Sequence, residues 1–167
     1  MSLAPLLDAS LAVQIHAATA IAAFALGALV LWRRKGTQLH RWLGRIWVVL
    51  MLVAATSALF INEIRLVGPF SPIHLFVLFT YWGIGQGLHA VIVRRDIRRH
   101  RAEMQGAYLG ALLIAGAFTL LPGRRMHAVL FGADAGWLPA LLVIVPLLCS
   151  AAGLWWRFRV GGRAGTA

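Results

Sequence analysis

The stretch SLAVQIHAATAIAAFALGALVLW, from Ser10 to Trp32, contains no charged residue over a length that can cross a bilayer. A membrane-spanning helix needs about 20 mainly apolar residues, because the hydrocarbon core is about 30 Å thick. We therefore predict that this stretch spans a membrane. Four later runs approach the same criterion, and they cover about residues 43–61, 73–93, 105–121 and 137–156.

The composition of the whole chain agrees with this pattern. Of its 167 residues, 60% are hydrophobic and 13% are charged, whereas about a quarter of the residues of a soluble domain are charged. We predict an all-α fold in one transmembrane domain over residues 1–167: a bundle of about five transmembrane helices. It would comprise a four-helix core of the type that holds cofactors, and one extra helix. The second and fourth runs can extend as helix into the basic segments before them.

The basic residues predict the orientation of the chain. Cytoplasmic loops of membrane proteins carry an excess of Lys and Arg. We therefore expect a bacterial inner membrane protein with its N-terminus outside and its C-terminus in the cytoplasm. Without a basic stripe that interleaves with aromatics, nucleic acid is not an expected partner despite the net charge of +11. Most Lys and Arg residues fall on the predicted cytoplasmic side: Arg33, Arg34, Lys35, Arg41, Arg45, Arg94, Arg95, Arg98, Arg99, Arg101, Arg157, Arg159 and Arg163.

Single residues near the predicted span ends add detail. Cys149 is the only cysteine, which rules out a disulfide framework within one chain. Tryptophans near the span ends are interpreted as interfacial anchors. These are Trp32, Trp42, Trp47, Trp137, Trp155 and Trp156.

The histidines carry most of the functional signal, because ionisable residues at membrane depth are costly and usually face a bundle interior. His16 lies in the outer part of the first run and His74 at the outer start of the third. His40 lies at the inner start of the second run, and His100 lies just before the fourth. Four successive helices therefore each supply one histidine, and the histidines alternate between the two sides.

This alternation predicts two ligand pairs. In an up-down four-helix bundle, the first and third helices are diagonal neighbours, and so are the second and fourth. His16 with His74, and His40 with His100, could then bind the irons of two stacked b-type haems. A plainer interpretation stays open for His40 and His100, which could be ordinary residues at the level of the lipid headgroups.

Small residues near these histidines have two interpretations. They leave room for a porphyrin edge, and they also let helices pack closely. The residues concerned are Ala20, Ala23 and Gly27 near His16, Gly44 near His40, Met104, Ala107 and Ala111 near His100, and the pairs Gly83/Gly87 and Gly106/Gly110.

The other histidines complicate the assignment. His89 follows His74 by fifteen residues on nearly the same helix face, so it could replace one inner ligand. His127 lies beside Arg124 and Arg125, where we expect a solvated surface residue. Those arginines could instead hold a haem propionate or an anionic reductant.

Several stretches resemble a family of bacterial multi-pass membrane proteins known as a domain of unknown function. They are GTQLHRWLGRIWVVLMLVAATSAL from Gly36, SPIHL from Ser71, HRAEM from His100 and LLPGR from Leu120, together with His16. A weaker resemblance is to di-haem cytochrome b and ferric-reductase-like membrane proteins, in which four successive helices each give a histidine. That resemblance implies haem ligation by the four histidines. This chain departs from it in having about five spans rather than six, and in lacking an ascorbate-site motif.

Three functions follow from these observations. The first is transmembrane electron transfer through two bis-histidine haems, which would make the chain a possible cytochrome b-type oxidoreductase. A small donor or acceptor such as quinol, a redox partner protein and a second copy of the chain are its possible partners beside the bilayer. The second is a histidine-based metal or proton transporter, although every carboxylate lies at a span end or in a loop. The third is a non-catalytic assembly subunit.

Overall fold

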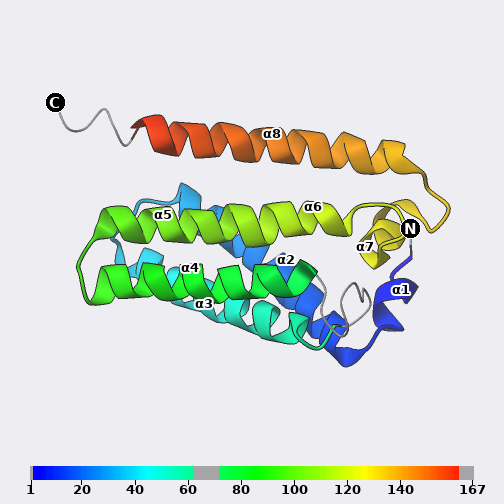
Figure 1. Cartoon of the computed structure of the whole chain (residues 1–167), viewed down its shortest axis with the longest axis horizontal. Helices are drawn as coiled ribbons and strands as arrows, with labels where there is room; N and C mark the ends of the chain where they lie inside the picture. The colour runs from blue at the N-terminus through cyan, green and yellow to red at the C-terminus, as the bar shows by residue number, and fades with distance from the viewer. Residues whose placement is uncertain (1, 62–71, 162–167) are drawn as a thin grey trace. The chain divides into compact units, whose positions relative to one another are not determined.

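The structure is a computed structural model, and it describes residues 2–61 and 72–161. Every element in these two ranges is helical, which confirms the all-α prediction (Figure 1). The elements are α1 (Ala4–Leu7), α2 (Leu11–Trp32), α3 (Gln38–Ala58), α4 (Pro72–Ile92), α5 (Ile97–Ala107), the π-helix η1 (Tyr108–Ile114), α6 (Ala115–Thr119), α7 (Arg125–Phe131) and α8 (Trp137–Gly161).

Three of the described helices are long and apolar enough to cross a membrane. They are α2, α3 and residues His74–Ile92 of α4, and Trp137–Gly153 of α8 forms a shorter apolar helix. The predicted fourth run belongs to one continuous helix, in which α5, η1 and α6 follow each other without a break. The count of five spans goes beyond this finding and stays a prediction.

Two of the helices begin earlier than the apolar runs suggested, because side chains in the basic loops cap them. The Thr37 hydroxyl accepts a hydrogen bond from the backbone N–H of His40 at 3.1 Å, so α3 begins at Gln38 rather than near residue 43. The Asp96 carboxylate accepts one from the N–H of Arg99 at 2.9 Å, so α5 begins at Ile97 rather than near residue 105. These caps place His40 and His100 at the start of their helices.

The chain forms two compact units, Leu6–Ala115 and Met1–Pro5 with Gly116–Ala167. In the first, which we call the bundle unit, α2 adjoins α3, α3 adjoins α4, α4 adjoins α5 and η1, and η1 returns to α2. This order makes α2 and α4 diagonal to each other, and likewise α3 and α5, as expected for an up-down bundle. In the second unit, Ala117, Ala140 and Ile144 form an apolar cluster.

The centre of the bundle unit is filled by two aromatic side chains over a glycine. A Cβ on Gly27 would lie 2.5 Å from Trp47 Nε1 and 2.6 Å from ring carbons of Tyr108. Trp47 Nε1 donates to the carbonyl oxygen of Ala23 at 3.0 Å, and the Tyr108 hydroxyl donates to that of Phe24 at 3.2 Å. The space at Gly27 is therefore taken by protein side chains, which corrects the expectation that it leaves room for a porphyrin edge.

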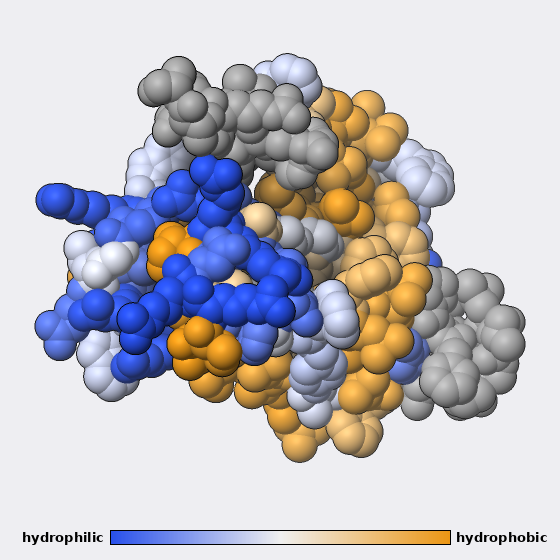
Figure 2. All heavy atoms as spheres, turned by 60° about the vertical axis from the view of Figure 1, so that its left-hand side comes forward, coloured by the Kyte–Doolittle hydropathy of each residue, from blue (hydrophilic) through white to orange (hydrophobic). Residues whose placement is uncertain are grey.

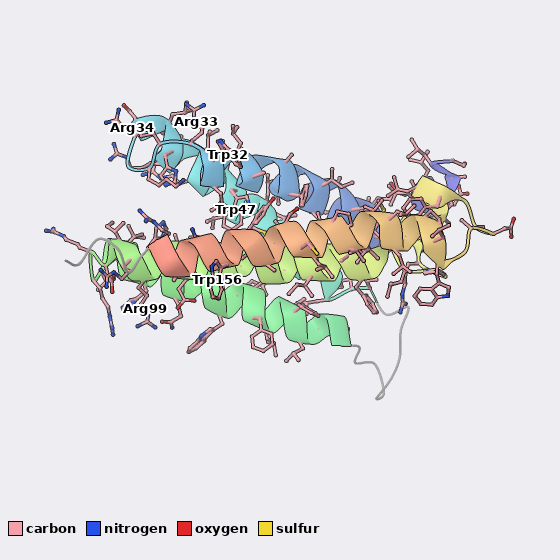
Figure 3. The ribbon with its side chains drawn as sticks, turned by 90° about the horizontal axis from the view of Figure 1, so that it is seen from above. Trp32, Arg33, Arg34, Trp47, Arg99 and Trp156 are labelled. Carbon is pink, nitrogen blue, oxygen red and sulfur yellow. The ribbon has the colours of Figure 1, made fainter. Side chains whose placement is uncertain are left out.

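Trp47 is not an interfacial anchor, and this prediction was wrong. The side chain is 4% exposed, whereas Trp32 and Trp42 are 87% and 55% exposed. Because α3 begins at Gln38, Trp47 lies more than two helical turns inside the helix. Figure 3 shows Trp47 on the ribbon between the labelled arginines at one end and the far end of the bundle unit.

Candidate functional site

His40 and His100 lie at the same end of the bundle unit, as the pairing hypothesis requires. His40 is within electrostatic range of His100 and Lys35, and Lys35 is within electrostatic range of Arg101. We call this region the basic end; it comprises the α2–α3 loop, the α4–α5 loop and the first turns of α3 and α5. Figure 3 shows Arg33, Arg34 and Arg99 gathered there.

The His100 ring is held by the main chain of the neighbouring helix. Its Nδ1 lies 2.9 Å from the carbonyl oxygen of Gly87. A carbonyl can only accept, so Nδ1 carries a proton, and in the neutral ring Nε2 keeps its lone pair. Ligand histidines are typically fixed in this way by a carbonyl on the other ring nitrogen.

Gly87 makes this contact possible because a side chain would hold the helices apart. A Cβ there would collide with the end of the Met104 side chain and lie 3.2 Å from Glu103 Cβ. Met104 therefore packs on α4, where the sequence had suggested room for a porphyrin. By contrast, no described atom lies within 4 Å of a Cβ placed on Gly106 or Gly110. Close helix packing thus accounts for Gly87, but not for that second glycine pair.

His40 is half-buried, and its Nδ1 is buried without a hydrogen-bond partner in the described part of the chain. Leaving a buried polar atom unpaired costs about 1–3 kcal/mol. Such an atom in a native structure needs an explanation, and a role in binding is one. His40 therefore differs from a headgroup-level histidine whose ring is solvated.

His16, near the other end of the bundle unit, repeats the geometry of His100. Its Nδ1 lies 2.8 Å from the carbonyl oxygen of Ala54 on α3, and Ser57 Oγ lies 3.5 Å from the same nitrogen. The ring thus donates from Nδ1 and leaves Nε2 with its lone pair. His16 and His100 therefore share one geometry, in which Nδ1 donates to a main-chain carbonyl of the neighbouring helix.

The half-buried His74 lies at a similar level of the bundle to His16. Ala55 and Ala58, next to the carbonyl that His16 contacts, pack against Val77 of α4. His74 precedes Val77 by less than one helical turn. The two histidines therefore lie on diagonal helices at neighbouring levels, although no described contact joins their rings.

The two histidine levels are separated by the aromatic layer at the centre. His40, Trp47 and Ala54 follow one another at seven-residue intervals, so they share nearly one face of α3. Fourteen residues of helix rise about 21 Å. Trp47 lies halfway between the level of His40 and the level of His16.

Two further predicted site residues, His89 and Arg124, lie at different places in the chain. His89 is exposed in the last turn of α4. In the second unit, the Arg124 guanidinium lies 4.5 Å from the centre of the Phe118 ring.

His127 contradicts the prediction of a solvated surface residue, because it is 1% exposed. Its Nδ1 lies 2.8 Å from the carbonyl oxygen of Leu120, and its Nε2 lies 2.8 Å from that of Ala135. Both nitrogens are thus occupied by main-chain oxygens, and His127 holds the two sides of the α7 segment together. Its neighbours in the sequence, two arginines and a glycine, gave no signal of burial.

The sequence analysis missed the groups that orient the histidines, since these are backbone carbonyls of Ala54 and Gly87. Of these two residues, only Gly87 was marked by the sequence, as one residue of a small-residue pair that is typical of close helix packing. It also missed an apolar groove of about 530 Å³ between α2 and α3. Ile15, Val53, Thr56, Ser57 and Phe60 are among its lining residues. Within the described residues, no group of three or more His, Cys, Asp or Glu side chains could hold a metal ion.

Residues 13–156 match the family model described as Predicted membrane protein (DUF2306). The chain belongs to this family. Comparison with curated proteins gave no match, and comparison with solved structures gave none either. This DUF2306 member is a multi-pass protein embedded in the membrane through its apolar helices. The family match covers the whole bundle unit from Val13 onwards, including all four histidines of the predicted pairs.

Proposed function

We propose that this protein carries electrons across the membrane through b-type haems bound between histidines of the bundle unit. The observation that supports this most directly is the hydrogen bonding of His16 and His100. Each ring is fixed through Nδ1–H to a carbonyl of the adjacent helix, which leaves Nε2 as an oriented ligand atom.

The placement of four histidines on diagonal helices supports two haem sites, with the porphyrins outside the space that side chains fill at Gly27 and Gly87. His40 and His100 would hold one haem near the basic end, and His16 and His74 would hold the other, with each pair on diagonal helices. Haem, when bound, supplies the one-electron couple of its iron. The carbonyls of Gly87 and Ala54 would hold two of the ligand rings in place. The arginines of the basic end can pair with propionate carboxylates.

The donor or acceptor that we propose is a lipid-soluble quinone or quinol. The groove between α2 and α3 is lined by apolar side chains that suit its hydrocarbon tail. Ser57 also lines the groove, and its Oγ lies 3.5 Å from His16 Nδ1. Its hydroxyl donates to the carbonyl oxygen of Ala54, so it could accept a hydrogen bond from a quinol O–H close to that histidine. By the positive-inside rule, we place the basic end in the cytoplasm of a bacterium. A redox protein would exchange electrons there.

Absorption spectra of the purified protein test this function, first oxidised and then reduced with dithionite. We expect a Soret band, sharp α-bands in the reduced state and two haems per chain by the pyridine haemochrome assay. His40→Ala and His100→Ala should each remove one and the same haem, while His16→Ala and His74→Ala should remove the other. His89→Ala is the matched control, since the exposed His89 should be dispensable for both.

A colourless protein from haem-replete cells would refute the proposal and direct attention to metal transport or assembly. Loss of haem in the His89→Ala control would overturn the assigned pairs while leaving haem binding intact. Equal loss of both haems in every ligand variant would mean that the sites do not form independently.

A further inference from the structure

The basic end carries more positive charge than the protein itself balances. Both carboxylates near it are already engaged with Arg99: Asp96 accepts from its backbone N–H, and Glu103 lies 3.7 Å from its Nε. Figure 2 shows hydrophilic residues gathered at this end of the bundle. The cations of the basic end, with Arg45 one turn further along α3, are Arg33, Arg34, Lys35, Arg41, Arg94, Arg95, Arg98, Arg99 and Arg101.

Two of these charges, Lys35 in the α2–α3 loop and Arg101 in α5, lie within electrostatic range of each other. The Lys35 ammonium donates to the carbonyl of Leu31 at the end of α2, which fixes it close to the helix. Partial burial, and then the nearby Arg101, lower the pKa of Lys35 from its ordinary value. Two cations held near each other repel, and an anion between them would remove that repulsion.

The turn after α4 retains a cation at a backbone position that suits glycine. Arg95 has φ 56°, whereas the other described residues with positive φ are Gly36, Gly123 and Gly132. This left-handed conformation is unfavourable for a residue with a Cβ. Glycine would satisfy the turn better, and the arginine at this position adds one more positive charge to the basic end.

We propose that the basic end binds the phosphate headgroup of an anionic phospholipid, with Lys35 and Arg101 on either side of it. These residues lie just beyond the ends of apolar helices, at the level where headgroups lie. Trp32 and Trp42, which are exposed at the same end, suit the same interface. The site is independent of the proposed redox function.

The test is thermal unfolding of the full chain in vesicles of phosphatidylcholine, or of phosphatidylcholine mixed with phosphatidylglycerol. We expect phosphatidylglycerol to raise the melting temperature by roughly 4 °C, since a bound ligand stabilises the folded state. Lys35→Gln combined with Arg101→Gln should lose at least half of this rise. Lys35→Gln also loses the contact with Leu31. That loss lowers the melting temperature equally in both lipids, so it cancels from the difference between them.

The matched control is Arg34→Gln combined with Arg98→Gln, which removes the same charge from the same loops. It should keep most of the rise. If both double variants lost the same part of the rise in melting temperature, the lipid would be held by diffuse attraction rather than at this site. An unchanged rise in the Lys35/Arg101 variant would also overturn the site. Inorganic phosphate added to phosphatidylcholine vesicles should have little effect; a rise equal to that from phosphatidylglycerol would overturn the choice of a lipid.

Arg95→Gly provides a second test should the double variant fail to fold. Glycine suits the turn, so this variant should melt at least as high as the original chain in phosphatidylcholine. It should nevertheless show a smaller rise with phosphatidylglycerol. A full rise would contradict a contribution of this arginine to lipid binding.

Discussion

The centre of the bundle unit and its basic end differ in how well their polar and charged groups are paired. At the centre, Trp47 and Tyr108 close over Gly27, and their polar hydrogens are taken up by carbonyls of α2. At the basic end, like charges lie together, a histidine nitrogen has no partner among the described residues, and Arg95 has a left-handed backbone.

This difference distinguishes residues that stabilise the folded chain from residues that destabilise it. Every group in the central layer lowers the free energy of the folded chain. Several groups at the basic end raise it, and such groups persist in proteins where they serve binding or catalysis. Substitutions should therefore destabilise the chain at the centre, and some should stabilise it at the basic end.

Gly27→Ala should have the largest effect. The new methyl group would overlap both aromatic rings, and Trp47 cannot move without losing its bond to Ala23. We expect a loss of about 2 kcal/mol in the free energy of unfolding, measured by denaturant titration in a zwitterionic detergent. The control is Gly44→Ala in α3, where no described atom lies within 4 Å of the new Cβ, and where a gain of about 0.5 kcal/mol is expected. Equal effects at the two glycines would mean that the centre is not tightly packed.

Trp47→Phe should have an intermediate effect. It removes the hydrogen bond to Ala23 and leaves a small gap, at a cost of about 1–2 kcal/mol in the same titration. Trp42→Phe changes an exposed ring that lies 4.9 Å from the Arg45 guanidinium, so its cost should be about 0.5 kcal/mol or less. If Trp42→Phe cost more free energy of unfolding than Trp47→Phe, the interpretation of Trp47 as an interfacial anchor would be supported instead.

Arg95→Gly should have the smallest effect, and one of the opposite sign. Relief of the left-handed backbone should raise the free energy of unfolding by about 0.5 kcal/mol in the same detergent, part of the gain being lost to the freer unfolded chain. Gly36→Ala, at φ 80°, should lower it by about 1 kcal/mol. A destabilised Arg95→Gly protein would show that the arginine side chain stabilises the fold after all.

The sequence predicted the apolar helices and the shared end of the two basic loops because both depend on composition. Spans follow from the length of uncharged stretches, and the basic loops meet because successive helices alternate in direction. The expected extension of two helices into the basic segments is confirmed, and the error about Trp47 comes from how far that extension goes. Thr37 and Asp96 start α3 and α5 inside the loops, and only this shift shows that Trp47 lies deep within the bundle.

The orientation of the histidine rings could not be predicted from the sequence, for a different reason. His16, His100 and His127 are all held by main-chain carbonyls, which every residue carries and which therefore leave no pattern in the sequence. Helix order still predicted that His40 and His100 lie at the same end of the bundle unit, because that prediction requires only the topology. It gave no warning that His127 is buried.

The aromatic layer at Gly27 also decides what kind of charge can move along the bundle. An ion would need water or polar groups along its path, because a charge in a low-dielectric interior is costly. Here the indole N–H and the phenol O–H are already bonded to carbonyls, and the remaining contacts are close-packed carbon. An electron needs no displacement of atoms to pass such a layer. The aromatic layer therefore offers an ion no free polar group at the centre of the bundle unit, and the electron transfer that we propose would not need one.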